Sequence, residues 1–211
     1  MKRNHQQGFS LLELMVTLLV MGIVLGFGVP NFMEFQRSSV MTSEANDFVS
    51  AIYLARGEAV KRQTMVTLCA SANATAAAPV CGVGPPTGYI VFVDDANPVV
   101  PAATDGNAVV DVGEQILLQH APPGGTIAIS TAPANSIYIT YAPNGFVVPT
   151  AFAAPTPSLN TVLFCDDRGN RDAGGTSTAR VVNVAPTGRA QIMRAIADVN
   201  VAIAATGGVC P

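Results

Sequence analysis

Charged and aromatic side chains are scarce in this sequence. Of its 211 residues, 12% are charged and 6% are aromatic, and tryptophan is absent. The formal net charge is −3 at pH 7, which argues against a general nucleic-acid coat, because such proteins neutralise phosphates with an excess of Lys and Arg. Lys and Arg are absent between Gln63 and Asp167. An anion site would therefore have to be built from the C-terminal third.

The usual patterns of metal and catalytic sites are also missing. No Cys-x-x-Cys spacing occurs, and His120 is the only histidine after His5, so a zinc site is not expected. His120 ends a predicted strand with no Ser or Cys motif near it, which leaves no candidate for a general base. The Asp and Asn residues between positions 94 and 111 do not follow the twelve-residue calcium loop. They are interpreted as polar turns, with calcium binding left open, and we expect no metal, no cofactor and no enzyme activity.

Only four cysteines occur, at positions well after the N-terminal residues: Cys69, Cys81, Cys165 and Cys210. Four cysteines allow three pairings, and the sequence does not choose among them. We favour Cys69–Cys81 and Cys165–Cys210, because the first pair flanks a loop and the second would pin the C-terminal tail.

One long apolar run stands out against this background. It extends over 21 residues from Phe9 to Val29, which as a helix would measure about 32 Å and could cross the hydrocarbon core of a bilayer. The basic, polar residues before it predict a cytoplasmic N-terminus and an outward-facing remainder. Glu13 lies inside the run, where an acid is costly and usually has a partner or a function.

The residues around Glu13 resemble a motif of a known protein family, and that family gives the glutamate a role. The pattern Gly8-Phe9-Ser10-Leu11-Leu12-Glu13, with Pro30 ending the apolar span, resembles the class III signal of type IV pilins and type II secretion pseudopilins. The resemblance implies that a prepilin peptidase cuts after Gly8 and methylates Phe9. It also implies that Glu13 faces the free amino group of a neighbouring subunit's Phe9 in a filament, and that Pro30 is a helix break.

A second helical stretch follows the proline. Apolar residues at steps of four and three place Met41, Ala45, Phe48, Ile52, Ala55 and Ala59 on one face. We therefore expect one long helix from about Phe9 to Arg62, whose second half packs against the rest of the chain.

The remainder is rich in Val, Ile, Thr and Tyr, with Gly, Pro, Asn and Asp between short runs, which predicts strands. The expected strands are Thr64–Ala70, Gly88–Val93, Gln115–His120, Thr126–Ser130, Ser136–Tyr141, Thr161–Cys165, Arg180–Val184 and Arg189–Met193. The predicted fold class is α+β, with a long N-terminal helix packed on an all-β head, as in type IV pilins. The expected parts are a leader at 1–8, a transmembrane segment at 9–29, an amphipathic continuation at 30–62 and a β-rich head at 63–211.

Several motifs along the chain are similar to the GspH/FimT branch of that family. They are Ala55-Arg56-Gly57-Glu58-Ala59, the stretches 88–94 and 111–117, the turn 141–145, and Pro186-Thr187-Gly188-Arg189 with the strand after it. The last resembles a Gly-Arg-x-Arg motif found in DNA-binding minor pilins, although Gln191 replaces the second arginine. The resemblance makes double-stranded DNA a candidate partner, with Arg189, Arg194, Arg180, Arg171 and Arg168 as candidate contacts. The alternative is that the turn and strand serve only the folding of the head.

The expected function is that of a minor pilin, processed by prepilin peptidase and assembled with other pilins into or at the tip of a type IV pilus. A pseudopilin of the type II secretion system is the alternative, and DNA uptake is a further hypothesis. The expected location is the bacterial inner membrane, in a single pass with the N-terminus cytoplasmic and the head periplasmic, followed by the filament.

Overall fold

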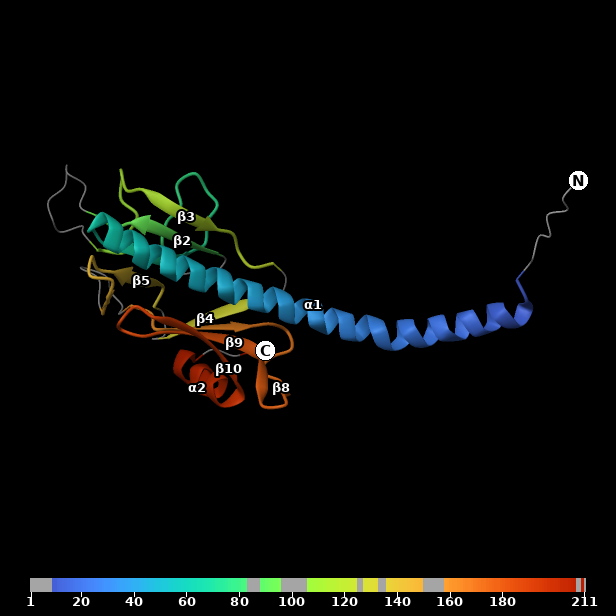
Figure 1. Ribbon diagram of the computed structural model, residues 1–211. Helices are drawn as coiled ribbons and strands as arrows, with labels where there is room; N and C mark the ends of the chain where they lie inside the picture. Colours follow the sequence, from blue (N-terminus) through green and yellow to red (C-terminus); the bar gives the residue numbers. More distant parts are fainter. Residues whose placement is uncertain are drawn as a thin grey trace, which may run out of the picture. The chain divides into compact units, whose positions relative to one another are not determined.

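The computed structural model describes residues 9–82, 88–95, 106–124, 127–132, 136–149, 158–207 and 210. The chain divides into two compact units, residues 1–40 and 41–211, and each is described by itself below. Helix α1, Leu11–Arg62, contributes to both units. The second unit combines the end of this helix with two antiparallel sheets and a short C-terminal helix (Figure 1).

The second half of α1 buries the face that the sequence predicts. All six expected residues of that face are buried, together with Ala51 between them. Four of these seven residues are alanines, whose small side chains allow the sheets to approach the helix backbone. The larger Phe48 side chain packs between the two sheets. Its ring makes edge-to-face contacts with Tyr89 at a centroid distance of 5.2 Å and with Phe164 at 5.8 Å. The amphipathic helix is therefore confirmed, and its apolar face holds the two sheets together.

Pro30 does not break α1, in contrast to our expectation, because the helix continues through it. The proline removes one N–H donor and crowds the carbonyl four residues earlier, at a cost of about 3 kcal/mol. That carbonyl belongs to Gly26, and a side chain at Gly26 or Gly28 would meet nothing within 4 Å.

Two sheets form the body of the second unit, and all their strand pairs are antiparallel. The first has the order β3-β2-β1-β5-β6 and the second the order β10-β9-β7-β4, with β8 pairing with β9. The strands of the first sheet are β1 (Val66–Ser71), β2 (Gly88–Val93), β3 (Ile116–His120), β5 (Tyr138–Tyr141) and β6 (Val147–Val148). Those of the second are β4 (Ala128–Ala132), β7 (Thr161–Cys165), β8 (Asp172–Ala173), β9 (Thr176–Val184) and β10 (Ala190–Ala195).

Each of the eight expected strands corresponds to one of these, with bounds shifted by a few residues. The strands β6 and β8 were not expected, because two residues carry no alternating pattern. Strand β9 begins at Thr176 rather than Arg180, since its Thr and Ser residues favour strand and turn alike.

The expected all-β head is wrong in one element, although the α+β class is confirmed. Helix α2, Ile196–Thr206, follows β10 directly and ends at Gly207, which has a positive φ of 59°. It buries Val199, Ala202 and Thr206 at helical spacing against β7 and β9, opposite α1 (Figure 1). Its β-branched residues obscure the helical pattern in the sequence, because they are as typical of strands as of buried helices.

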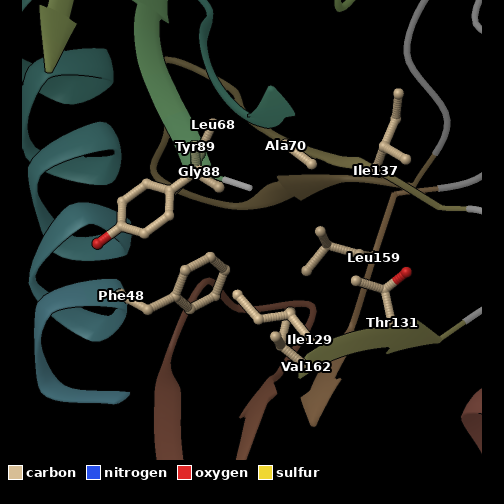
Figure 2. Close-up of a pocket in the computed structure, with 10 residues that line it drawn as sticks. All are labelled: Phe48, Leu68, Ala70, Gly88, Tyr89, Ile129, Thr131, Ile137, Leu159 and Val162. Atoms are coloured by element: carbon tan, nitrogen blue, oxygen red, sulfur yellow. The ribbon is translucent and has the colours of Figure 1, made fainter. Parts of the chain in front are cut away.

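A small cavity lies between the two sheets, beside the Phe48–Tyr89 contact. Its volume is about 30 Å³, and it is lined by apolar side chains from α1, β1, β2, β4 and β7, with Thr131 as the one polar residue in its wall (Figure 2). A space of this size and polarity offers too few hydrogen-bond partners to hold a water molecule firmly. It is a packing gap rather than a binding site.

Both favoured disulfides are present in the structure. Cys69 pairs with Cys81, closing a loop of separation 12, and Cys165 pairs with Cys210, at separation 45. In the chain-entropy model, loops of these lengths stabilise the fold by about 3 and 4 kcal/mol. The second bond ties the end of the chain, after α2, to β7.

Candidate functional site

The first half of α1 presents apolar side chains to its surroundings on every side. Large hydrophobic residues from Phe9 to Phe35 are exposed, and Phe9 itself is 85% exposed. The helix is long and apolar enough to cross a membrane, and the window that meets this criterion has no buried residue. A helix that is apolar all round needs lipid or protein around it. This segment therefore needs lipid or other protein subunits around it.

Glu13 is the one acidic residue between Phe9 and Val29 and lies in the first turn of α1. Its side chain is exposed, and within the described residues its carboxylate has no hydrogen-bond or ion-pair partner. The nearby hydroxyl of Thr17 instead donates to the Leu14 carbonyl of its own helix, at 2.9 Å. Gly8, the expected cleavage position, lies outside the described residues, and Phe9 is the first residue described.

Three of the sequence motifs meet at one place on the head. Arg56 of α1 donates from Nε to the Gly145 carbonyl at 3.0 Å, so the helix holds the turn between β5 and β6. Gly188 lies against the same carbonyl: a Cβ added there would be 2.5 Å from it. The φ of Gly188 is also positive, at 80°. The glycine of the Gly-Arg motif thus has a folding role, because both its conformation and its space require the absence of a side chain.

Arg189, the next residue, has no such internal contact. Its side chain is exposed and has no hydrogen-bond or ion-pair partner among the described residues. The backbone around it closes a tight hairpin, in which the Ala185 N–H donates to the Arg189 carbonyl at 2.9 Å. The adjacent Ala190 carbonyl accepts from the Tyr53 hydroxyl at 3.1 Å. The motif therefore combines a fixed turn with a free guanidinium.

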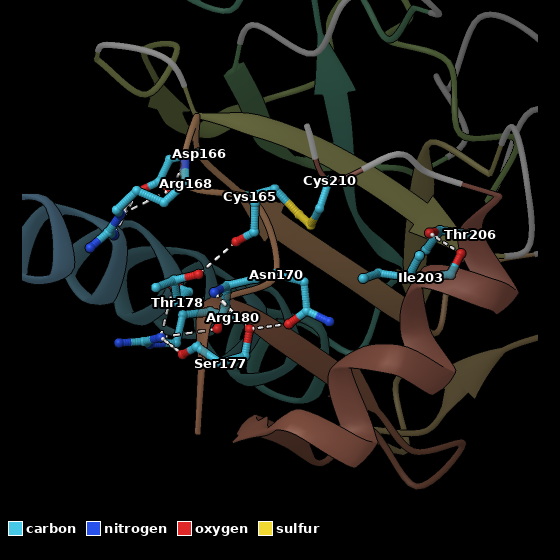
Figure 3. Close-up of a disulfide and its surroundings, with 12 residues drawn as sticks. Cys165, Asp166, Arg168, Asn170, Ser177, Thr178, Arg180, Ile203, Thr206 and Cys210 are labelled. Carbon is cyan, nitrogen blue, oxygen red and sulfur yellow. Dashed lines mark hydrogen bonds and ion pairs between the residues drawn. A yellow bond between two sulfur atoms is a disulfide. The ribbon is translucent and has the colours of Figure 1, made fainter. Parts of the chain in front are cut away.

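Arg168 and Arg180 are engaged inside the molecule (Figure 3). Arg168 makes a nearly buried ion pair with Asp166, with Nη2 and Oδ2 2.6 Å apart. The Nη1 of Arg180 donates to the carbonyls of Ser177, Thr178 and Ala179 at 2.9 to 3.0 Å. These side chains are therefore not available as simple exposed phosphate contacts.

Arg171 and Arg194 are exposed at other points of the second sheet. Arg194 follows Arg189 by five residues on the edge strand β10, a separation of about 16 Å along an extended chain. Residues 190 and 192 of this strand contribute to the core under α1, whereas Met193 packs with α2; Arg189 precedes the strand, and Arg194 lies at the register shift between Met193 and Ala195. The five arginines do not form a single surface.

The acidic loop residues have internal partners. The buried Asp94 carboxylate accepts hydrogen bonds from the Thr67 hydroxyl at 2.6 Å and from the backbone N–H groups of Asn107 and Ala108 at 3.1 and 3.0 Å. Burial still raises its pKa above the ordinary value. Burial likewise raises the pKa of Glu114 to about 8, although the Asp111 N–H counteracts this. Among the described residues, no group of three His, Cys, Asp or Glu side chains is arranged to hold a metal.

His120 stacks on Tyr89, with ring centroids 4.4 Å apart, and its Nδ1 lies 2.7 Å from the Ala121 carbonyl. Neither of these contacts brings a Ser or Cys nucleophile to the His120 ring. The arrangement is that of a strand-end histidine packed on an aromatic residue.

The sequence reasoning identified the motif around Arg56 but not its contact partners. Tyr53 was not singled out at all, although its hydroxyl joins α1 to β10. Its position one helical turn before Arg56 could have identified it from the sequence, because both residues lie on the edge of the apolar helix face.

Two family models match the chain. The family model described as "Type II transport protein GspH" matches residues 44–188, and that of the "Prokaryotic N-terminal methylation motif" matches residues 3–29. Comparison with curated proteins gave no match. Two crystal forms of the type IV minor pilin FimU from Pseudomonas aeruginosa PAO1 resemble the chain at 20% identity. One covers 75% of this chain and 92% of its own at a TM-score of 0.45, the other 72% and 91% at 0.39.

Proposed function

The chain belongs to the GspH family of type II transport proteins and carries a prokaryotic N-terminal methylation motif, and we propose that it is a minor pilin of a type IV pilus. It is a pilin-type protein and not an enzyme. On this proposal residues 1–8 are a leader that prepilin peptidase removes, and Phe9 becomes the methylated N-terminus. The remaining parts are a membrane segment at 9–29, a helix continuation at 30–62 and the head at 63–211.

The observation that carries the proposal is the unpartnered acid on an exposed apolar helix. Glu13 has no partner among the described residues, and the side chains around it are apolar. An acid in such surroundings is costly, and a cation supplied by assembly would offset that cost. The free amino group of a neighbouring subunit's Phe9 is such a cation, since cleavage after Gly8 creates it. Glu13 is therefore proposed as an assembly residue.

The orientation follows from the charge before the apolar segment. Lys2 and Arg3 precede it and hold the N-terminus in the cytoplasm by the positive-inside rule. The head would then lie in the periplasm, where disulfides persist. The two disulfides of the head fit that compartment.

The experiment compares Glu13→Ala with Thr17→Ala, one helical turn further along, in cells that assemble the filament. The Glu13 variant should reach the inner membrane in normal amount but be absent from sheared filaments, whereas the Thr17 variant should be incorporated. Normal incorporation of Glu13→Ala would contradict the role of this charge. A pseudopilus subunit of type II secretion is the alternative filament: deletion of the gene should abolish twitching on the pilus proposal and exoprotein secretion on the alternative.

A second candidate function, binding of double-stranded DNA, is favoured by one observation. Arg189 is an exposed guanidinium without a partner among the described residues, fixed on a tight turn. Guanidinium–phosphate contacts of this kind are sequence-tolerant and weaken with salt. Gln191 in place of the second arginine reduces the number of such contacts, so Arg189 would carry the interaction.

A further inference from the structure

Arg56 of α1 carries a guanidinium that the fold uses only in part. The residue is half-buried, and its Nε donates to the Gly145 carbonyl at 3.0 Å. An arginine side chain has five N–H donors, and the others of Arg56 have no partner among the described residues. The contact with Gly145 therefore fixes a charged group whose remaining donors are available to an anion.

The turn that carries Arg189 lies directly beside this guanidinium. A Cβ on Gly188 would be 3.2 Å from the Arg56 Nε, which places the Gly188 Cα within about 4.7 Å of that nitrogen. Successive Cα atoms are about 3.8 Å apart, so the Arg189 Cα lies within about 8.5 Å of the same nitrogen. Arg189 is itself exposed, with no partner among the described residues. One extended polyanion can therefore contact both guanidiniums, whichever way the Arg189 side chain points.

The acidic residues of the second half of α1 lie on other sides of the helix. At about 100° per residue, Glu44, Asp47 and Glu58 are about 120° or more around the helix from Arg56. Glu58 also makes ion pairs with two basic residues in the last turn. Neither Arg56 nor Arg189 has an ion-pair partner within the described part of the chain. The two guanidiniums thus form a positively charged place that no ion pair neutralises.

We propose that Arg56 and Arg189 together bind the phosphates of duplex DNA, with Arg56 supplying from α1 the second guanidinium that the strand lacks at Gln191. Guanidiniums match phosphate oxygens in geometry and charge. Each DNA strand offers one phosphate about every 3.4 Å along the helix axis, so both side chains find a partner without a fixed spacing between them. This inference rests on the second candidate function, DNA binding by Arg189, and adds a residue of α1 to that site.

The test measures binding of a short DNA duplex to the full chain in detergent, by fluorescence anisotropy over a series of salt concentrations. The first variant is Arg56→Gln. The Nε2 of a glutamine takes the place of the arginine Nε, so this variant keeps a donor for the Gly145 carbonyl while it removes the charge. It should bind the duplex several-fold more weakly at low salt. The slope of log Kd against log salt concentration should fall by about 0.9, the value of one phosphate contact.

Arg62→Gln is the matched control, because it removes the same charge from the same helix, about 120° around it from Arg56. It should leave the affinity and the salt slope unchanged. Wild-type affinity in Arg56→Gln would overturn the inference, as would an equal loss in Arg62→Gln. If the wild-type chain binds a polyglutamate peptide in place of the duplex, and Arg56→Gln loses that binding, DNA is not the ligand.

Arg56→Lys is the second variant, and it decides the matter if denaturant unfolding shows that Arg56→Gln is destabilised. The lysine keeps the positive charge but not the planar donors. This variant should keep the wild-type salt slope, because one cation still faces a phosphate. A slope reduced as in Arg189→Gln would mean that Arg56 acts only by positioning the turn, and would overturn the inference.

Failure of the underlying function would look different. A wild-type chain that binds no DNA at low salt would overturn DNA binding as a function, and this inference with it. Binding that is lost in Arg189→Gln but kept in Arg56→Gln would overturn only the role of Arg56. Incorporation into filaments, measured with Glu13→Ala, is independent of both results.

Discussion

The Nε of Arg56 lies 3.0 Å from the carbonyl oxygen of Gly145 and donates a hydrogen bond to it across 89 positions of sequence. A Cβ on Gly188 would sit 2.5 Å from that oxygen, 2.8 Å from the Tyr141 ring and 3.2 Å from the Arg56 Nε. One helix residue and two turn glycines are therefore packed as a unit. This unit places the hairpin that carries Arg189.

Gly188→Ala should destabilise the fold by about 2 kcal/mol or more, because it combines a positive φ with a clash against backbone. Gly57→Ala is the matched control, since a Cβ there meets nothing within 4 Å. On an exposed helical position it should leave stability unchanged or raise it by about 0.5–1 kcal/mol. Denaturant unfolding of both variants in the same detergent is the measurement, and equal midpoints would contradict the packing argument.

Gly8→Glu should block removal of the leader. If the peptidase cuts after Gly8, a bulky acid at that position leaves the chain at its full-length mass in cells that contain the peptidase. Intact-mass spectrometry of the membrane fraction measures this, with Gln7→Glu as a control one residue away that should still be trimmed. Normal trimming of Gly8→Glu would place the cleavage elsewhere.

Stability should fall as the pH rises from about 5 to 8, through the deprotonation of Glu114. Burial raises its pKa in the folded state to about 8, above the ordinary value of a glutamate. In that window the folded state therefore holds a proton that the unfolded state has lost, and rising pH favours unfolding. Glu114→Gln should flatten the dependence, and Asp198→Asn, at an exposed acid, should not. Unfolding midpoints measured at several pH values decide this, and parallel curves for wild type and Glu114→Gln would refute it.

Replacement of both Cys165 and Cys210 by serine should destabilise the chain by about 4 kcal/mol in the chain-entropy model. The expected local effect is earlier opening of α2, because the disulfide ties its C-terminal side to β7. Hydrogen exchange should show faster labelling of residues 196–206 than of β1. If exchange rises uniformly over the head instead, the bond does not act locally on α2.

Arg189→Gln should weaken binding of short duplex DNA to the full chain if DNA uptake is a function. Fluorescence anisotropy at two salt concentrations is the measurement, since phosphate contacts weaken as salt rises. Arg171→Gln, at another exposed arginine of the head, serves as the control. An absence of binding at low salt would leave the Gly188-Arg189 turn with its folding role alone.

Much of the fold follows from local patterns. The Val- and Thr-rich composition of residues 64–70 predicts β1, and the three-four spacing from Met41 to Ala59 predicts the buried helix face. These succeed because strands and amphipathic helices repeat over a few residues. The local pattern also predicted one long helix through Pro30, which the structure has, but it missed α2, whose composition suits strand and helix equally.

The sequence by itself determined the apolar segment with its single acid, the buried face of the second half of α1 and most of the strands. Each of these depends on residues that lie close together along the chain. Only the tertiary structure decided what the arginines do. Arg180 contacts Thr42 across 138 positions, Arg168 pairs with Asp166, and Arg189 and Arg194 stay exposed. The charge of an arginine does not predict whether its side chain is buried, paired or exposed. That depends on the carbonyls and carboxylates that folding brings within hydrogen-bond distance of the guanidinium.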